Sequence, residues 1–273
     1  MSAQINLRAE VSSKAHLGSN VSIGPFTIVE DGAVIGDGTV VGGNALIGGG
    51  ARIGKDCRIH HGAIVGHMPQ DLKYAGEPTT CEIGDRTVIR EYTTLHRGTG
   101  DTGRTIIGSD CFIMGYVHIA HDCVIGNKVI MSNAAMLAGH CIVEDNVTLG
   151  GILAIHQFVR IGRHSMIGGG LRVGKDIPPY SLAGGEPLRF EGLNSIGLRR
   201  RGFSREVLDI LEKTFNVLYY TGLNVTQALE KIRKDQSLMA FQEVQHVVQF
   251  ISDSQRGIIV PPRRRQHADR DLR

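Results

Sequence analysis

Aliphatic residues recur at every sixth position along most of the chain from Ile5 to Val173. The series runs from Ile5 to Val65, returns over residues 83–95, and continues from Ile107 to Val173, with one methionine among its members. Small residues often stand four positions after each of them. A period of six matches neither a helix nor an alternating strand, and it is typical of hexapeptide-repeat β-helices.

The hexapeptide period predicts an all-β parallel β-helix. Three hexapeptides would form one triangular coil, in which each short strand points one aliphatic side chain inward and small residues occupy the corners. The period is interrupted over residues 67–82 and 96–106, where we expect two protruding loops. We assign this domain to residues 1–187.

Helical spacing replaces the six-residue period after Pro178 and Pro179. Ser204 is a suitable N-cap for a helix over residues 205–220, a second helix can begin at Thr226, and a third is expected over residues 237–252. We therefore predict a C-terminal helical domain over residues 188–255. The segment 256–273 is polar and basic, and we expect it to be a disordered tail.

Composition narrows the class of protein. The chain has 273 residues with 36 glycines, no tryptophan and only 5% aromatics, which suits a narrow core of small aliphatics. A net charge of +3 does not indicate a nucleic-acid partner. No apolar run is long enough to span a bilayer and no signal peptide is recognisable, so we expect no transmembrane segment and a cytoplasmic location. The five cysteines form no C-x-x-C pair and are expected to be reduced.

The triangular coil brings histidines together on one edge. Residues three hexapeptides apart stack about 4.8 Å from one another on neighbouring coils. Two columns result, one of His121, Gly139 and Gln157, and one of Asp122, His140 and Phe158. His118 and His156 fall beside these columns. A lone histidine at a corner would be an ordinary solvated group, but four of them with an acid indicate a site.

Two chemistries could use such a cluster. Gamma-class carbonic anhydrases bind zinc on the same fold, but with an H-x-x-x-x-H spacing, whereas this chain has H-x-x-H in "HIAHDC" over residues 118–123. We therefore predict no metal. In acid–base catalysis, the imidazole would take a proton from a hydroxyl group, the carboxylate would orient the imidazole, and a backbone N–H of Gly139 would bind an oxyanion. No serine or cysteine nucleophile adjoins the cluster, which favours direct transfer.

Several motifs together resemble one family. They are "QDLKYAGEPT" (70–79), "HRGT" (96–99), "HIAHDC", "LAGH" (137–140), "HQF" (156–158), "DIPPY" (176–180) and "GLRRRGFS" (197–204). Over about residues 5–255 the chain is similar to the UDP-N-acetylglucosamine 3-O-acyltransferases of lipid A biosynthesis. The resemblance implies a left-handed β-helix and a homotrimer with active sites between subunits. It also implies transfer of a 3-hydroxyacyl chain, carried on the phosphopantetheine arm of acyl carrier protein, with no other cofactor.

The resemblance assigns roles to individual residues. The general base, its acidic partner and the oxyanion donor correspond to His121, Asp122 and Gly139. The loop and acceptor-site residues correspond to Gln70, Asp71, Lys73, His118, His140, His156 and Gln157. The nucleotide-binding segment corresponds to Asn194, Arg200 and Arg201. Family members often carry an acid where this chain has Ile196, and an apolar side chain cannot accept a hydrogen bond from uracil.

The acyl chain is expected in a groove between subunits that runs along the coils past Met166 and Gly169. Gly169 would meet the chain at about its tenth carbon, and a glycine there would admit a longer donor such as 3-hydroxytetradecanoyl. Three alternatives stay open. They are another hexapeptide-fold acyl- or acetyltransferase, a 3-amino acceptor, and a non-enzymatic scaffold that only trimerises. The arginines could also bind the acidic acyl carrier protein.

Overall fold

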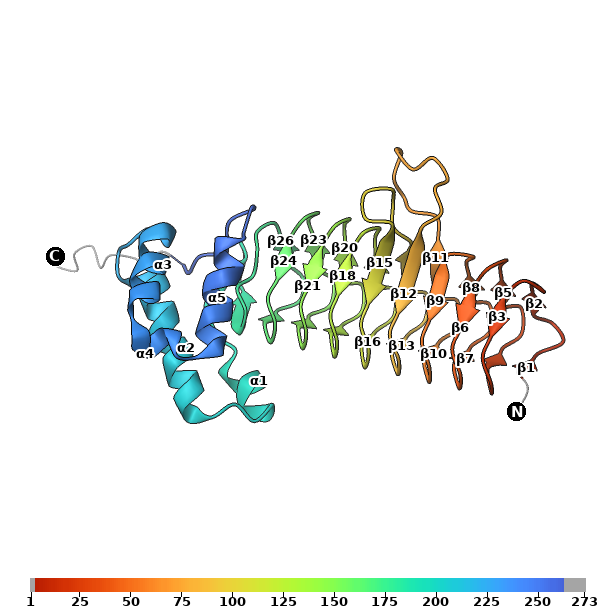
Figure 1. The fold of residues 1–273 in the computed structure, drawn as a ribbon, viewed down its shortest axis with the longest axis horizontal. Coiled ribbons are helices and arrows are strands. Elements are labelled where there is room, and N and C mark those ends of the chain that lie inside the picture. The colour runs from red at the N-terminus through yellow and green to blue at the C-terminus, as the bar shows by residue number, and fades with distance from the viewer. Residues whose placement is uncertain (1–2, 263–273) are drawn as a thin grey trace, which may run out of the picture.

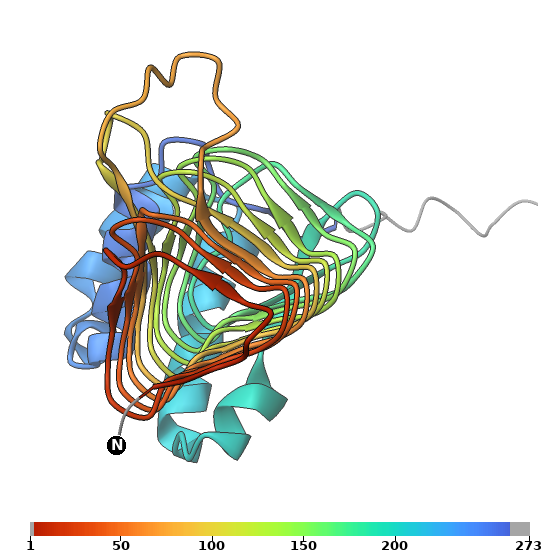
Figure 2. The same cartoon turned by 90° about the vertical axis from the view of Figure 1, so that its right-hand side faces the viewer.

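The computed structural model describes residues 3–262, which form a three-sided prism followed by a helical domain (Figure 1). The coils stack along the long axis of the molecule, and their triangular outline is visible end-on in Figure 2. Each side of the prism is a sheet of short parallel strands, and each coil adds one strand to every sheet. The fold is the all-β left-handed β-helix with a C-terminal helical domain that the sequence predicts.

Three sheets contain all the strands of the described residues. The first sheet consists of β1 (Gln4–Ile5), β4 (Ser22–Ile23), β7 (Val40–Val41), β10 (Arg58–Ile59), β13 (Val88–Ile89), β16 (Phe112–Ile113), β19 (Ile130–Met131), β22 (Thr148–Leu149), β25 (Met166–Ile167), β27 (Ser181–Gly184) and β28 (Arg189–Leu193). The second consists of β2 (Glu10–Val11), β5 (Ile28–Val29), β8 (Leu46–Ile47), β11 (Ile64–His67), β14 (Thr94–His96), β17 (His118–Ile119), β20 (Met136–Leu137), β23 (Ala154–Ile155) and β26 (Arg172–Val173). The third consists of β3 (His16–Leu17), β6 (Val34–Ile35), β9 (Ala51–Ile53), β12 (Thr80–Ile83), β15 (Arg104–Ile107), β18 (Val124–Ile125), β21 (Ile142–Val143) and β24 (Arg160–Ile161).

The strand register shows where the coils lengthen. Ser22 pairs with Val40, one regular coil later, whereas Ile64 pairs with Thr94 and Thr94 pairs with His118. The extra residues lie in two loops, 68–79 and 97–103, which fall within the two interruptions of the sequence period. Both loops leave a strand of the second sheet and return to the third. They therefore project from the same edge of the prism, at the top of Figure 1.

The core consists of inward aliphatic side chains, which stack in one column on each of the three sheets. Ile119, Leu137 and Ile155, on successive coils of the second sheet, are all at most 3% exposed. Burying an aliphatic side chain of this size contributes about 1.5–3 kcal/mol. Cysteines and threonines such as Cys123 and Thr105 are buried at the corners, where a bulkier side chain would not fit. All five cysteines are free thiols.

The C-terminal domain begins with a hairpin and continues as five helices. β28 pairs antiparallel with β27, so the segment predicted as helical from residue 188 starts as a strand. The helices are α1 (Ser195–Arg200), α2 (Arg205–Tyr220), α3 (Val225–Lys234), α4 (Gln236–Met239) and α5 (Gln242–Ser252). Ser204 caps α2 as predicted. Among these helices, none is long and apolar enough to cross a membrane.

Two expectations for the C-terminal region are wrong. The single helix expected over residues 237–252 is divided into α4 and α5, because the backbone of Phe241 is extended between them. The disordered tail expected from residue 256 is packed for at least its first residues: Ile258 and Ile259 are buried, and the Ile259 N–H donates to the Asp176 carbonyl. Residues 263–273 of that expected tail lie outside the described residues.

Candidate active site

His121 and Asp122 form a hydrogen-bonded pair at the edge between the second and third sheets. They follow β17, and the distance between His121 Nδ1 and Asp122 Oδ2 is 2.7 Å. An ionised carboxylate can only accept, so Nδ1 carries the proton and donates it to Asp122. Nε2 is then left as an acceptor for a substrate proton. His121 is 14% exposed in its side chain and can be reached from solvent.

Loop 97–103 surrounds the carboxylate of Asp122. Oδ1 accepts from the Thr99 N–H at 3.0 Å and from the Thr102 hydroxyl, and Oδ2 accepts from the Thr99 hydroxyl at 2.7 Å. Burial raises the pKa of Asp122, but hydrogen bonds from Thr102, His121 and Thr99 outweigh burial and lower the pKa to about 2. Asp122 is therefore a carboxylate at neutral pH, although only 3% of the residue is exposed.

Gly139 lies one coil beyond His121 and leaves room for its ring. A Cβ on Gly139 would lie 2.6 Å from His121 Cε1 and 2.8 Å from Nε2, so any larger residue would displace the imidazole. The amide N–H of Gly139 has no acceptor within residues 3–262. It is available to a negatively charged oxygen next to the imidazole, as an oxyanion donor must be.

Three more of the expected histidines lie along this edge. The His140 ring stacks on Phe158 at 4.7 Å, and its centroid is 5.2 Å from that of His121. His118 shares a 2.7 Å hydrogen bond with Thr94 Oγ1, and burial, with the nearby His96 and His121, lowers the pKa of His118 to about 4. Such a histidine is neutral at physiological pH.

His156 and Gln157 lie two coils beyond His118 and His121, at the end of β23. His156 Nδ1 is 3.1 Å from the Gln157 carbonyl oxygen, and both residues are exposed. They extend the polar edge but do not contact His121. The structure therefore brings His118, His121 and His140 into one cluster and leaves His156 at its margin.

The cluster of His121, Asp122 and His140 could be mistaken for a metal site. Their ligand atoms all lie within 4.8 Å of one another. Asp122 nevertheless already accepts hydrogen bonds on both oxygens from Thr99, Thr102 and His121, so a cation would have to replace several of these bonds. The hydrogen bonding favours an acid–base pair over a metal centre.

The acceptor-loop residues Gln70, Asp71 and Lys73 lie on loop 68–79, which rises from the same edge. Asp71 Oδ1 accepts from the Lys73 N–H at 2.9 Å, which shapes the start of the loop. Glu77 accepts from the Gly100 N–H at 3.2 Å and so joins loop 68–79 to loop 97–103. The two loops stand together beside His121.

Helix α1 and the preceding Asn194 lie beside a different part of the prism. Asn194 caps α1 and donates from Nδ2 to the His164 carbonyl at 2.9 Å, while Arg201 donates to Asn146. Between α1 and the first sheet is a cavity of about 720 Å³. Among its lining residues are Asn146, Met166, Asn194, Ile196, Arg200 and Arg201. Its cationic and amide groups suit an anionic, hydrogen-bonding ligand.

The acyl groove was expected between subunits, and one chain shows only where Met166 and Gly169 lie. Met166 lines the cavity beside α1, and Gly169 follows β25 at the edge between the first and second sheets, whereas His121 lies at the edge between the second and third. A Cβ on Gly169 would lie 2.8 Å from the Gly151 carbonyl oxygen, so the stacking of the coils itself requires this glycine. Within one chain, His121 and Gly169 therefore lie on different edges, and the groove expected between subunits stays a prediction.

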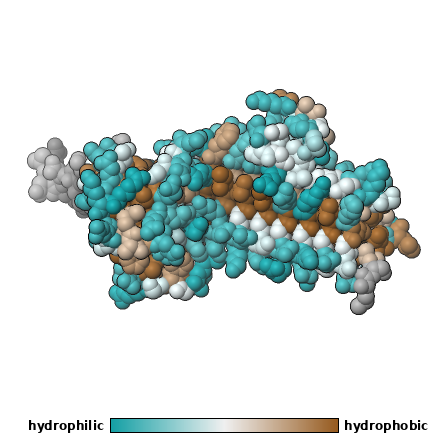
Figure 3. All heavy atoms as spheres, viewed as in Figure 1, coloured by the Kyte–Doolittle hydropathy of each residue, from teal (hydrophilic) through white to brown (hydrophobic). Residues whose placement is uncertain are grey.

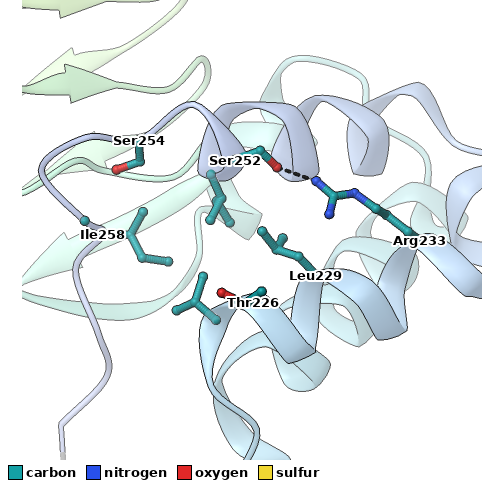
Figure 4. A pocket seen from close by; sticks show the side chains of 9 residues that line it. Thr226, Leu229, Arg233, Ser252, Ser254 and Ile258 are labelled. Atoms are coloured by element: carbon teal, nitrogen blue, oxygen red, sulfur yellow. Dashed lines mark hydrogen bonds between the residues drawn. The ribbon is translucent and has the colours of Figure 1, made fainter.

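A second cavity, of about 420 Å³, lies among the C-terminal helices (Figure 4). Leu229 and Ile258 form apolar walls, and Arg233 donates to the Ser252 hydroxyl at 2.6 Å. It holds none of the residues expected in the site, and it lacks a base.

Sequence reasoning missed Thr99, Thr102 and His96. His96 is buried, its ring bonds the Met68 carbonyl, and its centroid is 5.2 Å from that of His118. The motif "HRGT" contains two of the three. Because the motif opens an interruption of the six-residue period, no column could be assigned to it.

Comparisons with known proteins agree with this geometry. Residues 176–259 match the family described as UDP-N-acetylglucosamine O-acyltransferase, domain 2, and residues 14–49, 33–67 and 104–139 match bacterial transferase hexapeptide repeats. An acyl-carrier-protein-dependent UDP-N-acetylglucosamine O-acyltransferase of Burkholderia mallei is 44% identical over 206 residues, covering 74% of this chain and 78% of that protein.

Solved structures give the same result over nearly the whole chain. The UDP-N-acetylglucosamine acyltransferase of Francisella novicida is 36% identical with a TM-score of 0.92, and 95% of each chain is covered. The corresponding enzyme of Bacteroides fragilis is 43% identical with a TM-score of 0.90, covering 93% of this chain and 99% of the other. The chain belongs to the UDP-N-acetylglucosamine O-acyltransferase family.

Proposed function

We propose that this enzyme transfers a 3-hydroxyacyl chain from acyl carrier protein to the glucosamine 3-position of UDP-N-acetylglucosamine. The observation that carries the proposal is the 2.7 Å bond between His121 Nδ1 and the Asp122 carboxylate, beside the N–H of Gly139, which has no acceptor among the described residues. Family membership supplies the substrate class, since the Burkholderia mallei relative is named for this donor and acceptor.

The geometry supports a direct attack. His121 Nε2 accepts the proton of the acceptor hydroxyl as its oxygen attacks the thioester carbonyl, and the Gly139 N–H donates to the oxygen that becomes negative. When the tetrahedral intermediate collapses, the carbon–sulfur bond breaks and the thiolate takes the proton from the imidazolium. Asp122 stabilises the imidazolium while it exists and fixes which nitrogen faces the substrate.

Mass spectrometry of the product tests the proposal. The purified protein is incubated with UDP-N-acetylglucosamine and a panel of 3-hydroxyacyl thioesters of acyl carrier protein. We expect one acyl group to be added to the sugar nucleotide, and we expect donors longer than ten carbons to be preferred. An acetyl-CoA donor that outperforms every carrier-protein thioester would instead favour another hexapeptide acetyltransferase.

The acceptor atom needs its own measurement, because a histidine base serves a hydroxyl or an amine equally well. Mild alkali hydrolyses an ester and leaves an amide intact. We expect the product to lose its acyl group in alkali, as a 3-O-ester does. A product that resists alkali would indicate a 3-amino acceptor.

We further propose a homotrimer with sites between subunits. In one chain, Arg201 beside the first sheet and His121 at the far edge belong to different parts of the prism. Figure 3 shows an apolar band along the β-helix, and outward strand residues such as Val124 and Ile142 are more than a third exposed. Such a band is suited to contact with another copy.

Mixed trimers test whether the site is shared. His121→Ala and Arg201→Ala each impair a different half of a shared site. Trimers assembled at random from the two variants would contain intact pairs at roughly a quarter of their interfaces. We expect about that fraction of wild-type activity at low acceptor concentration, and a mixture no more active than its components would place both residues in one subunit's site.

A further inference from the structure

The motif "HRGT", residues 96–99, joins the two loops beside the active site. The His96 ring bonds the Met68 carbonyl, at the start of loop 68–79. The Arg97 N–H donates to the His67 carbonyl at 3.1 Å, and its guanidinium lies over the Tyr74 ring at 5.4 Å. The first two residues of the motif therefore hold loop 68–79 at both its base and its middle.

The next two residues close loop 97–103 over Asp122. A Cβ on Gly98 would lie 2.3 Å from the Arg104 backbone nitrogen, so only glycine allows the two ends of the loop to approach this closely. The following residue, Thr99, then donates both its N–H and its hydroxyl to Asp122. The Thr102 hydroxyl is the third donor from the same loop.

Asp122 differs from the residues stacked on it. His140 and Phe158 occupy the same corner on the next two coils, with φ near +60° in all three, but of these three residues only Asp122 is hydrogen-bonded by the threonines of loop 97–103. The corner backbone is therefore common to all three residues, and the loop is what distinguishes Asp122. The loop supplies the three donors that fix the direction of the Asp122 carboxylate toward His121.

We propose that Thr99 and Thr102 are positioning residues for acyl transfer: they hold the Asp122 carboxylate, which in turn orients His121, and the "HRGT" motif couples this arrangement to the acceptor loop 68–79. The inference rests on the proposed function, because it assigns the pair His121–Asp122 to that reaction. It extends the catalytic machinery to a loop that touches no reacting atom.

Loss of the threonine donors should change the pH dependence of kcat. The charged or titratable groups facing Asp122 are His121 at 2.7 Å, His140 at 3.8 Å and the buried thiol of the adjacent Cys123, and Asp101 lies 3.8 Å from His140 on the other side. Without the threonine donors, burial would raise the pKa of the carboxyl with less to oppose it. A protonated Asp122 cannot stabilise the imidazolium, so the acid limb of the kcat profile should move to higher pH.

Valine substitutions test the role of the hydroxyl groups. Thr99→Val and Thr102→Val keep the shape of the side chain, and their combination should lower kcat roughly 10–100-fold, as small misplacements of catalytic groups do. The acceptor KM should change much less. Thr99→Ser, which restores a hydroxyl, should remain close to wild type. Thr39→Val removes a buried hydrogen bond to the Gly54 carbonyl, away from both loops, and serves as the matched control.

A spectroscopic measurement makes the test independent of turnover. The Nδ1–H proton of His121 should give a downfield NMR resonance in the wild type, and it should shift or vanish in the double valine variant but not in Thr39→Val. An unchanged resonance together with an unmoved kcat profile would overturn the proposal. Because Thr102 is exposed, Thr102→Val keeps the test valid if Thr99→Val does not fold. A wild type inactive on UDP-N-acetylglucosamine, with the resonance still dependent on the threonines, would contradict the proposed function and not the positioning role.

Discussion

Two edges of the same prism have nearly the same backbone geometry but carry different side chains. The edge between the second and third sheets, here the catalytic edge, carries His121, Asp122 and both loops. The edge between the first and second sheets, here the tyrosine edge, carries Tyr92 and Tyr116, whose rings stack at 5.4 Å. The corner backbone is nearly the same in both, with φ of 60° at Asp122 and 61° at Tyr116.

The comparison shows that the coil provides geometry while the corner residues provide chemistry. On the tyrosine edge, stacked rings contribute about 0.5–1.5 kcal/mol beyond the apolar area that they bury. On the catalytic edge, a buried carboxylate is tolerated because Thr99, Thr102 and His121 satisfy it. The stacked columns of inward aliphatic side chains are common to both edges. Their stacking fixes the spacing of every corner.

A large effect on activity is expected from a substitution of Gly139. Gly139→Ala would place a Cβ 2.6 Å from His121 Cε1, and we expect kcat to fall roughly 10²–10³-fold because the base is displaced. Gly115 occupies the same hexapeptide position on the tyrosine edge, where a Cβ would lie 3.3 Å from its nearest neighbour. Gly115→Ala should leave kcat nearly unchanged, and equal losses in the two variants would show that the effect is structural.

Arg201 lines the cavity beside α1, away from the catalytic edge. A charge-assisted hydrogen bond contributes about 1.5–3 kcal/mol, so Arg201→Ala should weaken acceptor binding roughly 10–100-fold. Isothermal titration with UDP-N-acetylglucosamine measures this directly. If acceptor affinity is unchanged and only the affinity for acyl carrier protein falls, the arginine serves the donor.

The pKa of Asp122 predicts a pH effect on stability. Because folding lowers this pKa to about 2 from the ordinary 3.8, the carboxylate stabilises the fold above about pH 4, and that contribution is lost as pH falls toward 2. A difference of this size between the folded and unfolded pKa corresponds to about 2 kcal/mol. Denaturant unfolding at pH 6 and pH 2.5 should show that the wild type loses about this much more than Asp122→Asn. Equal losses in both proteins would contradict the assignment.

The smallest effect is expected on the tyrosine edge. Tyr92→Leu removes one ring of the stack with Tyr116 and should lower the free energy of unfolding by about 1 kcal/mol. Its kcat should stay at the wild-type value, since neither ring lies at the catalytic edge. A large fall in kcat would mean that this edge also contributes to a site.

The six-residue period was sufficient to predict which site residues stack on neighbouring coils. Because residues three hexapeptides apart stack, the repeat alone assigns His121 to a column with Gly139 and Asp122 to a column with His140, and both columns are present. Thr99 and Thr102 could not be placed in the same way, because a loop outside the period has no column. The role expected for Gly169 stays a prediction, because the acyl groove was expected between subunits and a single chain contains only one of its sides.

The helical domain was less predictable for a related reason. Helical spacing and the Ser204 cap located α2, but the break between α4 and α5 depends on the extended backbone of Phe241, which carries no local breaker such as proline or glycine. The segment after residue 256 looked polar overall, yet Ile258 and Ile259 are buried, and the Ile259 N–H donates to the Asp176 carbonyl of the prism. Tertiary contacts decided both cases.

The most direct test of the central claim is the rate of acyl transfer by His121→Ala beside that of His16→Ala. His16 is an exposed histidine on β3 in the N-terminal coil and shares only the fold with His121. If His121 is the general base, its replacement should lower kcat roughly 10²–10⁴-fold while His16→Ala remains at the wild-type rate. Activity of His121→Ala within about twofold of wild type would contradict the account, because general acid–base catalysis contributes far more than that.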